Sequence, residues 1–254
     1  MRLIRRIPLL TRYALFYLHP RTPRSQRDEK DYAAFLKGCR IALVGPAPSI
    51  TGSGHGARID SCDRVVRLNH SLPVPPELQT DAGIRTDILY HNLWRDHPRA
   101  PSFTELIPVL LDSVKWICAV NPYLNAEHPF ADDIDAFTGI LRDRLPFRTV
   151  APRPWIRLQG TLLTRPGAGL SAIRDLLRFD IAELYLTGFT FYQTGTEYHA
   201  GYRGIGRSKV HQQGAQMKAL KRWIRHDPRI VIDDTLRQIL HAEPTPAKRR
   251  ESDQ

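Results

Sequence analysis

A glycine-rich segment, GPAPSITGSGHG at residues 45–56, directly follows a short apolar run. Glycine allows positive φ angles and lets backbone N–H groups come close to an anion, so this segment could hold a phosphate group. It lacks the Gly-Lys-Ser/Thr of a Walker loop, and its glycine spacing does not match the dinucleotide-binding fingerprint. A simple strand-to-helix turn explains the same glycines equally well. The segment therefore predicts either a phosphate cradle or a turn.

The acidic residues and cysteines do not form the pattern of a metal site. The acidic clusters at residues 132–135 and 233–234 are typical of a helix start and a polar turn, respectively. The three cysteines, Cys39, Cys62 and Cys118, include no CxxC pair, and their odd number disfavours a disulfide framework. We therefore expect no metal and a reducing compartment.

The elements that must position a site follow from the alternation of β-rich runs with helical stretches. The runs lie at residues 40–44, 64–68, 86–90, 115–120 and 183–187, and the helical stretches lie near 102–112, 132–143, 168–179 and 212–225. This alternation predicts a Rossmann-like α/β/α sandwich with a mostly parallel sheet. In such sheets ligands bind beyond the carboxyl ends of the strands. We therefore expect the site in the segments that follow Val44, Leu68, Tyr90 and Thr187.

The chain is long enough for one substantial core. It has 254 residues and 42% hydrophobic composition, which excludes a disulfide miniprotein and a disordered tail. We expect a basic amphipathic segment over residues 1–30, a single globular domain over 31–241 and a polar tail over 242–254.

The basic charge is concentrated near the N-terminus. Residues 1–30 hold eight Lys or Arg and two Asp or Glu, which accounts for six of the eleven net positive charges. Apolar residues recur there at helical spacing, as in a helix that lies in a membrane interface: Leu3, Ile7, Leu10, Ala14 and Tyr17. The alternative is a terminal helix packed on its own domain. No stretch is apolar enough to span a bilayer, and no signal-peptide cleavage site follows.

Two stretches carry a resemblance to a known family. The stretch ALVGPAPSITGSGHGARIDSCDRVVRLNHSLPVP, followed by TDAGIRTDILYHN, resembles the large sialyl motif of glycosyltransferase family 29, the sialyltransferases. It keeps these residues in family order: Ser49, Gly52, Ile59, Asp60, Asp63, Val66, Arg67, Asn69, Asp81, Gly83, Thr86 and Asn92. The stretch RPGAGLSAIRDLLRFDIAELYLTGFTFY resembles the small sialyl motif, including Gly188 and Phe189. Tyr198 and His199, and then His211 with its following residues, resemble the two short C-terminal motifs.

The sequence departs from the family pattern at four places. Gly167, Ala168 and Gly169 stand where the family has Ser-Thr-Gly, which removes a hydroxyl and leaves backbone groups to meet the nucleotide. Pro46 replaces an asparagine, and Gln216 replaces a glutamate, which keeps hydrogen bonding but loses the charge. The cysteine of the small motif is missing, so we expect no disulfide between the motifs.

The resemblance implies an α/β fold of the GT-A-like sialyltransferase type and an inverting transfer of a sialic-acid-type sugar from a CMP-activated donor. It implies that His211 is the general base, and that His199 and Tyr198 stabilise the departing phosphate. The alternatives are that His211 is only a helix cap and that His199 is only a loop residue. The expected substrate-binding residues are Gly45, Ser49, Asn69, Asn92, Gly167, Ala168, Gly169, Gly188, Phe189 and Tyr198. Among them, Phe189 is expected to lie against the cytosine or, alternatively, to be a core residue after the strand, and Asn69 is alternatively a turn residue. CMP carries one phosphate, so the reaction needs no metal cofactor.

Three classes of function stay open at this point. The first is a sialyltransferase-like enzyme at the cytoplasmic, inner face of the cell membrane, with the N-terminal segment on anionic lipid and a glycan or glycolipid as acceptor. The second is a transferase of the same fold that uses CMP-linked 3-deoxy-octulosonate (CMP-Kdo). The third is a noncatalytic nucleic-acid or polyanion binder, which is disfavoured because the charge lies in the terminal segment rather than along a central groove.

Overall fold

The computed structural model describes residues 26–69, 71–92, 110–122, 144–191, 193 and 212–241. Within these residues, one sheet contains seven strands in the order β5-β4-β3-β2-β1-β6-β7. The strands are β1 (Arg40–Val44), β2 (Arg64–Leu68), β3 (Ile88–His91), β4 (Trp116–Ala119), β5 (Phe147–Thr149), β6 (Glu183–Thr187) and β7 (Ile230–Ile232). All six pairings are parallel. The strand order reverses between β1 and β6, which makes their carboxyl ends the topological switch point.

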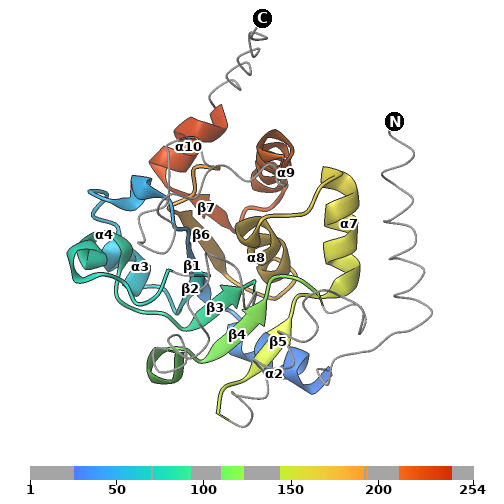
Figure 1. Ribbon diagram of the computed structural model, residues 1–254, viewed down its shortest axis with the longest axis horizontal. Helices are drawn as coiled ribbons and strands as arrows, with labels where there is room; N and C mark the ends of the chain where they lie inside the picture. The colour runs from blue at the N-terminus through green and yellow to red at the C-terminus, as the bar shows by residue number, and fades with distance from the viewer. Residues whose placement is uncertain are drawn as a thin grey trace, which may run out of the picture.

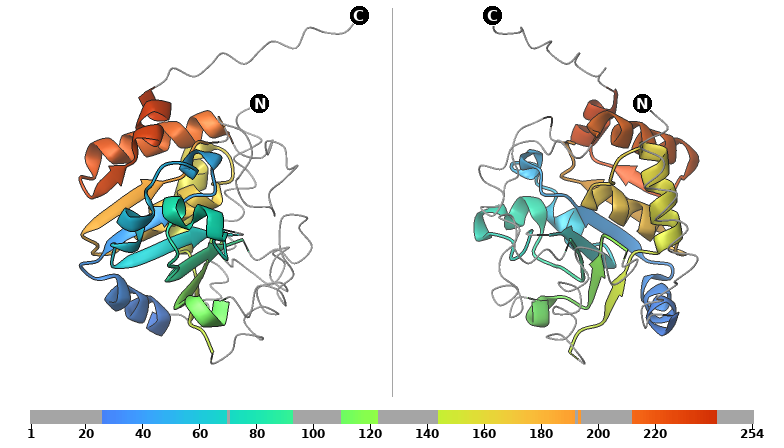
Figure 2. Two further views of the ribbon diagram at one scale, coloured as in Figure 1. Left: turned by 90° about the vertical axis from the view of Figure 1, so that its left-hand side faces the viewer. Right: turned by 45° about the vertical axis from the view of Figure 1, so that its right-hand side comes forward.

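Helices cover both faces of the sheet (Figure 1). They are α2 (Gln26–Leu36), α3 (Gly56–Asp60), α4 (Gln79–Ala82), α7 (Pro152–Leu162), α8 (Ala168–Leu176), α9 (Gln213–His226) and α10 (Asp234–His241), with short 3₁₀ turns η1 (Pro48–Ile50) and η2 (Pro76–Leu78). Figure 1 shows α7, α8 and α9 on one side of the sheet and α3 and α4 on the other. Figure 2 shows α2 at one end of the molecule and α9 and α10 at the other.

Alternation along the strands divides the core into two layers. In β1, Ile41 and Leu43 pack with α2, α7, α8 and α9, whereas Ala42 and Val44 pack with α3, α4 and both 3₁₀ turns. Successive side chains of a strand point to opposite faces, so a strand covered on both sides is expected to be mainly apolar, as β1 is. The predicted α/β/α sandwich is therefore confirmed, and its sheet is parallel throughout the described residues.

The predicted elements agree with the structure to different degrees. The runs at 40–44, 64–68 and 183–187 are strands with those bounds, and the runs at 86–90 and 115–120 become the shorter or shifted strands β3 and β4. The sequence pattern does not predict strands β5 and β7 or helices α2, α3, α4, α7 and α10. The expected helix at 132–143 and most of the one at 102–112 lie outside the described residues. The expected boundary at residue 30 falls inside α2.

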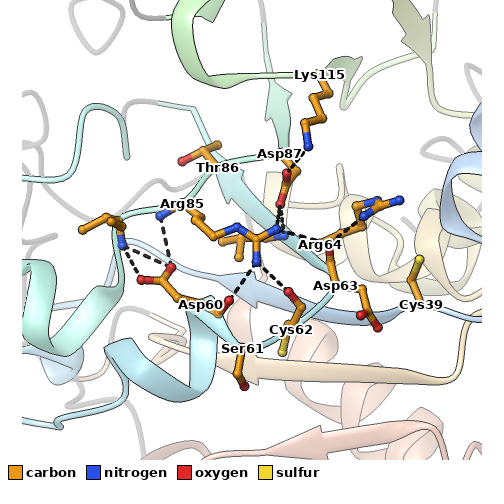
Figure 3. Close-up of polar contacts among 12 residues, drawn as sticks. Cys39, Asp60, Ser61, Cys62, Asp63, Arg64, Arg85, Thr86, Asp87 and Lys115 are labelled. Carbon is orange, nitrogen blue, oxygen red and sulfur yellow. Dashed lines mark hydrogen bonds and ion pairs between the residues drawn. The ribbon is translucent and has the colours of Figure 1, made fainter.

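Polar residues at the amino ends of the strands fix the register of β2, β3 and β4 (Figure 3). The Asp87 carboxylate is 5% exposed and accepts hydrogen bonds from the Val65 amide at 2.9 Å and from Arg85 at 3.0 Å, and it forms an ion pair with Lys115 at 3.2 Å. The Asp60 carboxylate accepts hydrogen bonds from the backbone of Ile84 and Arg85. Two large-motif residues, Asp60 and Thr86, thus belong to this end of the sheet, opposite the carboxyl ends.

No helix in the described ranges is long and apolar enough to cross a membrane. The N-terminal segment before residue 26 and the tail after residue 241 lie outside these ranges. All three cysteines are free.

Candidate functional site

A pocket of about 120 Å³ opens at the carboxyl ends of β1, β2 and β6, where the topology predicts a ligand. Five parts of the chain line it: the turn after β1, the end of β2 with Asn69, the start of α8, the turn after β6, and Gln216 of α9. Seven predicted substrate-binding residues are described and lie at or beside this pocket. Asn69, Gly167, Ala168, Gly169, Gly188 and Phe189 line it, and Gly45 lies directly behind Gly188.

Two glycines form the back of the pocket by bringing two backbone turns into contact. A Cβ atom on Gly45 would lie 2.3 Å from the Gly188 carbonyl oxygen, and one on Gly188 would lie 2.5 Å from the Gly45 oxygen. Gly188 also has a φ of 71°, which favours glycine. The amide of Ala47 donates to the Gly188 carbonyl at 3.0 Å and ties the two turns together. Glycine is therefore required here for close backbone approach.

Phe189 forms one wall of the pocket. A Cβ atom on Gly169 would lie 2.6 Å from Phe189 Cε1, so the first turn of α8 packs directly on the ring. Because Gly169 has no side chain, the ring can lie flush with the helix start and present apolar surface to a ligand. This placement is compatible with the expected stacking against a base.

The amino end of α8 points its free amides at the pocket. Gly167 is the N-cap, and no side chain caps the helix. The first intrahelical bond runs from the Ser171 amide to the Gly167 carbonyl at 2.9 Å, so the amides of Ala168, Gly169 and Leu170 have no partner within the helix. A helix start carries partial positive charge and binds phosphate groups. The backbone thus supplies donors where the family motif has hydroxyls.

Gln216 joins α9 to this helix start. Its Oε1 accepts a hydrogen bond from the Gly167 amide at 3.0 Å, and its side chain is buried. A glutamate could accept the same bond, so this contact does not require the loss of charge at position 216. The Gln216 side chain lines the pocket and fixes the position of the Gly167 amide.

Asn69 adopts a left-handed backbone conformation at the end of β2, with a φ of 47°. Its Oδ1 accepts a hydrogen bond from the Asn92 amide at 2.9 Å. This bond aligns the ends of β2 and β3 and places Asn69 at the pocket wall. Asn69 therefore occupies a turn and also lines the pocket, and its role in substrate binding stays a prediction. Oδ1 of Asn92 and Oγ of Ser49 are buried without a hydrogen-bond partner among the described residues, and neither residue lines the pocket.

The expected phosphate cradle at residues 45–56 is a turn. The Asp81 carboxylate accepts hydrogen bonds from the amides of Gly52 and Gly54, each at 2.7 Å. These two bonds lower the pKa of Asp81 below its usual range. The loop therefore binds an anion, but the anion is a side chain of the same chain. Its amides are occupied, and the phosphate-cradle interpretation is wrong for them.

Sequence reasoning missed Asp233, which was assigned to a polar turn. Its side chain is 6% exposed and caps α10, because Oδ1 accepts a hydrogen bond from the Leu236 amide at 2.6 Å. Oδ2 accepts hydrogen bonds from the Thr187 hydroxyl and the Gly188 amide, at the turn that lines the pocket. An acidic residue directly before a helical pattern is an N-cap signal that could have identified the cap. The contact with β6 has no such local signal.

The predicted catalytic residues His211 and His199, together with Tyr198, lie outside the described residues. Helix α9 begins at Gln213, which agrees with the expected helix after His211. A different histidine, His91, is fully buried at the end of β3, and burial lowers its pKa to about 4. Among the residues that the structure describes, no three His, Cys, Asp or Glu side chains are grouped to hold a metal ion.

Comparison with known proteins adds a family and a fold. Residues 12–128 match the sequence model of glycosyltransferase family 29 (sialyltransferase). The chain is similar in structure to the sialyltransferase CstII from Campylobacter jejuni in complex with the substrate analogue CMP-3FNeuAc, with a TM-score of 0.54, 14% identity and coverage of 76% of this chain and 81% of that one. It is also similar to a mammalian sialyltransferase, with a TM-score of 0.50, 18% identity and coverage of 88% and 84%. A search of curated protein sequences gave no match.

The family match covers the large-motif stretch. At these identities the likeness to solved structures bears on the fold, while the sequence match bears on the family. The sequence match to the family 29 model thus covers a little under half of the chain, and the solved sialyltransferases share its fold.

Proposed function

We propose that this enzyme transfers a sialic-acid-type sugar from a CMP-activated donor to a hydroxyl group of a glycan acceptor. The observation that carries the proposal is the switch-point pocket, which joins an uncapped helix start to an aromatic wall in a chain that matches the family 29 model. The CstII structure was obtained with CMP-3FNeuAc, and a nucleotide of that kind suits the chemistry of the pocket.

The pocket offers a separate group for each part of CMP. The phosphate binds at the amides of Ala168 and Gly169, where the helix start favours negative charge. The cytosine lies against Phe189, which supplies apolar contact area. The side chain of Asn69 bonds the ribose or the phosphate, since an amide can both donate and accept.

The reaction is a direct displacement with inversion. The acceptor oxygen forms a bond to the anomeric carbon while the bond from that carbon to the phosphate oxygen breaks, and CMP leaves with the bonding electrons. His211 takes the proton of the acceptor hydroxyl, because a neutral imidazole is a base near physiological pH. His199 and Tyr198 donate to the phosphate as its charge grows.

Nucleotide recognition can be tested before any acceptor is known. We expect CMP to raise the melting temperature of the purified protein and UMP to have little effect. CMP-sialic acid and CMP-Kdo are then compared as donors by CMP release with a panel of oligosaccharides. Turnover that requires CMP-Kdo selects the second donor, and a protein that binds polyanions but neither CMP nor a CMP-sugar is a noncatalytic binder. Turnover should persist in EDTA, and restoration by Mg²⁺ after loss in EDTA would contradict metal independence.

The histidine assignment has a control variant in helix α9, which follows His211 in the sequence. His211→Ala should abolish transfer and leave CMP affinity within a few fold, because the base acts on the acceptor hydroxyl. His226 is exposed at the far end of α9, and His226→Ala should leave transfer unchanged. A folded His211→Ala enzyme with full activity would exclude His211 as the base.

A further inference from the structure

The Asp233 carboxylate is a buried charge whose hydrogen bonds join three parts of the chain at the back of the pocket. It accepts hydrogen bonds from the Thr187 hydroxyl at 2.7 Å, the Gly188 amide at 3.2 Å and the Leu236 amide at 2.6 Å. The described residues show no ion pair to this carboxylate. Helix capping alone uses only one of its oxygens, so the bonds to Thr187 and Gly188 need a separate explanation.

The second oxygen extends the pairing of β6 with β7 beyond the end of β7. Backbone pairing ends at Leu186 and Ile232, and the Asp233 amide then donates to the Leu186 carbonyl at 3.1 Å. The next donor along β6 is the Gly188 amide, which faces this same edge. Because α10 begins at Asp234, no backbone carbonyl continues the ladder. The Asp233 side chain supplies the missing acceptor.

This acceptor holds the turn from which the pocket wall projects. Gly188 is pressed against Gly45 on its other side, so its position is fixed between the Gly45 backbone and the Asp233 carboxylate. Phe189 follows directly and forms the wall that faces the start of α8. A shift of Gly188 therefore moves the Phe189 ring relative to the α8 amides.

A histidine extends the network to the loop after β1. Nδ1 of His55 lies 3.1 Å from Thr187 Oγ1. The Tyr185 hydroxyl lies 3.3 Å from the same Nδ1. Because the single hydroxyl proton of Thr187 is donated to Asp233, a hydrogen bond between Thr187 and His55 requires the imidazole as donor. Thr187 is fully buried and cannot use water instead. The chain of bonds His55, Thr187, Asp233 thus links the loop after β1, the end of β6 and the start of α10.

We propose that Asp233 is a positioning residue for the donor nucleotide, which acts through Thr187 and Gly188 to set the distance between Phe189 and the amino end of α8. This inference rests on the proposed function, because it assigns the nucleotide to this pocket. It predicts that loss of the Asp233 hydrogen bonds weakens donor binding more than an equally destabilising substitution elsewhere in α10 does.

The test uses the full-length protein and variants at neighbouring positions. Asp233→Asn keeps the size of the side chain but replaces one carboxylate oxygen with an NH₂ group, which cannot accept a hydrogen bond. The remaining oxygen can accept either from the Leu236 amide or from Thr187 and Gly188, but not from both sides. Asp234→Asn removes the same charge from a side chain that is 94% exposed. Thr187→Val removes the hydroxyl, and Thr187→Ser restores it. Ile239→Val, which shortens a core residue of α10, controls for lost stability.

We expect Asp233→Asn and Thr187→Val to weaken CMP binding by about tenfold in calorimetry, because loss of these hydrogen bonds lets the Gly188 turn, and with it Phe189, move relative to the α8 amides. They should raise KM for the CMP-sugar in donor hydrolysis, with a smaller change in kcat. Asp234→Asn, Thr187→Ser and Ile239→Val should bind CMP like the wild-type protein. If Asp233→Asn does not fold, Thr187→Val decides the outcome.

Two results would overturn the inference, and they differ from failure of the proposed function. The first is a wild-type CMP affinity in folded Asp233→Asn or Thr187→Val. The second is an equal loss of affinity in Ile239→Val at a matched drop in melting temperature. A wild-type protein that binds no CMP rejects the proposed function and this inference together.

Discussion

Two residues of this protein show how the backbone conformation at a position can decide its role. Asn69 has a φ of 47° and Gly188 a φ of 71°, and both lie where a strand ends at the pocket. Asparagine and glycine tolerate the left-handed region far better than other residues. At Asn69 the conformation also directs a polar side chain to the ends of two strands, so a substitution must separate the backbone effect from the side-chain effect.

Asn69→Gly makes that separation. Glycine keeps the positive φ and removes the amide, so we expect CMP affinity to fall by about 1–3 kcal/mol while the fold persists. Asn69→Ala should lose a similar amount of CMP affinity and additional stability, because alanine at positive φ costs about 1–2 kcal/mol. Calorimetry with CMP and urea denaturation of both variants measure the two effects. Unchanged CMP affinity in Asn69→Gly would remove Asn69 from the nucleotide site.

Asp81 gives a pH-dependent prediction. Hydrogen bonds from the Gly54 and Gly52 amides lower its pKa in the folded protein, so the ionised form stabilises the fold. This contribution is complete above the unfolded pKa of about 3.9 and is lost as the pH falls from there through the lower folded pKa. Asp81→Asn should therefore be less stable than wild type at pH 7, and the difference should shrink below about pH 4. A constant difference in urea denaturation from pH 7 to pH 3 would contradict this.

The residues of the site divide into those that a local pattern reveals and those that only the fold brings together. The motif resemblance found Gly188, Phe189 and residues 167–169, which the structure places around one pocket. It could not find Asp233, because the contact with Gly188 depends on the pairing of β6 with β7. The glycine content of residues 45–56 could not decide between a phosphate cradle and a turn, because Asp81, the partner of the Gly52 and Gly54 amides, lies in α4.

At the scale of elements, α8 is fixed at both ends. Its amino end is bonded to Gln216 through Gly167. Near its carboxyl end, Asp175 is 3% exposed and pairs with the buried Arg148 of β5 and with Arg178. Tyr90 of β3 donates to the same carboxylate at 2.8 Å. Burial alone would raise the pKa of Asp175, but the two guanidinium groups outweigh burial and hold it below its usual range.

Removal of one partner from this pair should be costly. Asp175→Ala leaves Arg148 buried without its closest carboxylate, and we expect a loss of about 3–5 kcal/mol in the free energy of unfolding. The double variant Arg148→Met with Asp175→Leu should recover much of that loss, since no charge is then left unpaired. Asp234→Ala, at an exposed ion pair, should change stability by about 0.5 kcal/mol or less. Equal urea midpoints for Asp175→Ala and wild type would contradict the role of the pair.

The length and burial of each element explain why the sequence predicts some elements and misses others. The apolar runs of β1 and β6 are buried on both faces and stand out in the sequence. Strand β5 has three residues and contains Arg148. A charged residue is not expected in a buried strand, and the sequence does not show that Arg148 pairs with Asp175. Strand β7 is equally short. Helix α7 begins at Pro152 with a second proline at position 154, and proline is accepted only in the first turn of a helix.

At the scale of the whole molecule, the net charge of +11 is the feature most open to test. We propose that the N-terminal segment binds the inner, cytoplasmic face of the cell membrane. Helix α2 begins at Gln26, and Tyr32 and Leu36 are fully buried in the core. Glu29 also pairs with Arg148 and Arg178. A truncation that spares the fold must therefore end before α2.

We expect the full chain to sediment with vesicles of anionic lipid at low salt and to be released as salt rises, because screening weakens surface electrostatics. Deletion of residues 1–25 should remove vesicle binding and keep CMP binding. Neutral phosphatidylcholine vesicles are the lipid control. A full chain that stays in the supernatant with anionic vesicles, or a truncated chain that unfolds, would favour a helix packed on its own domain.

The pairing of β1 with β6 also determines the stage of chain synthesis at which the pocket can form. Arg40 of β1 is paired with Glu183 of β6, so β1 is synthesised long before one of its two neighbouring strands. At about 5–20 residues per second this delay is roughly 7–30 s. Strands β1 to β4 can associate earlier, but the wall with Phe189 needs β6, and its support needs Asp233. Nascent chains that end before β6 therefore contain five of the seven strands but lack the Phe189 wall of the pocket, and a ligand of this pocket can stabilise the protein only after most of the chain has been made.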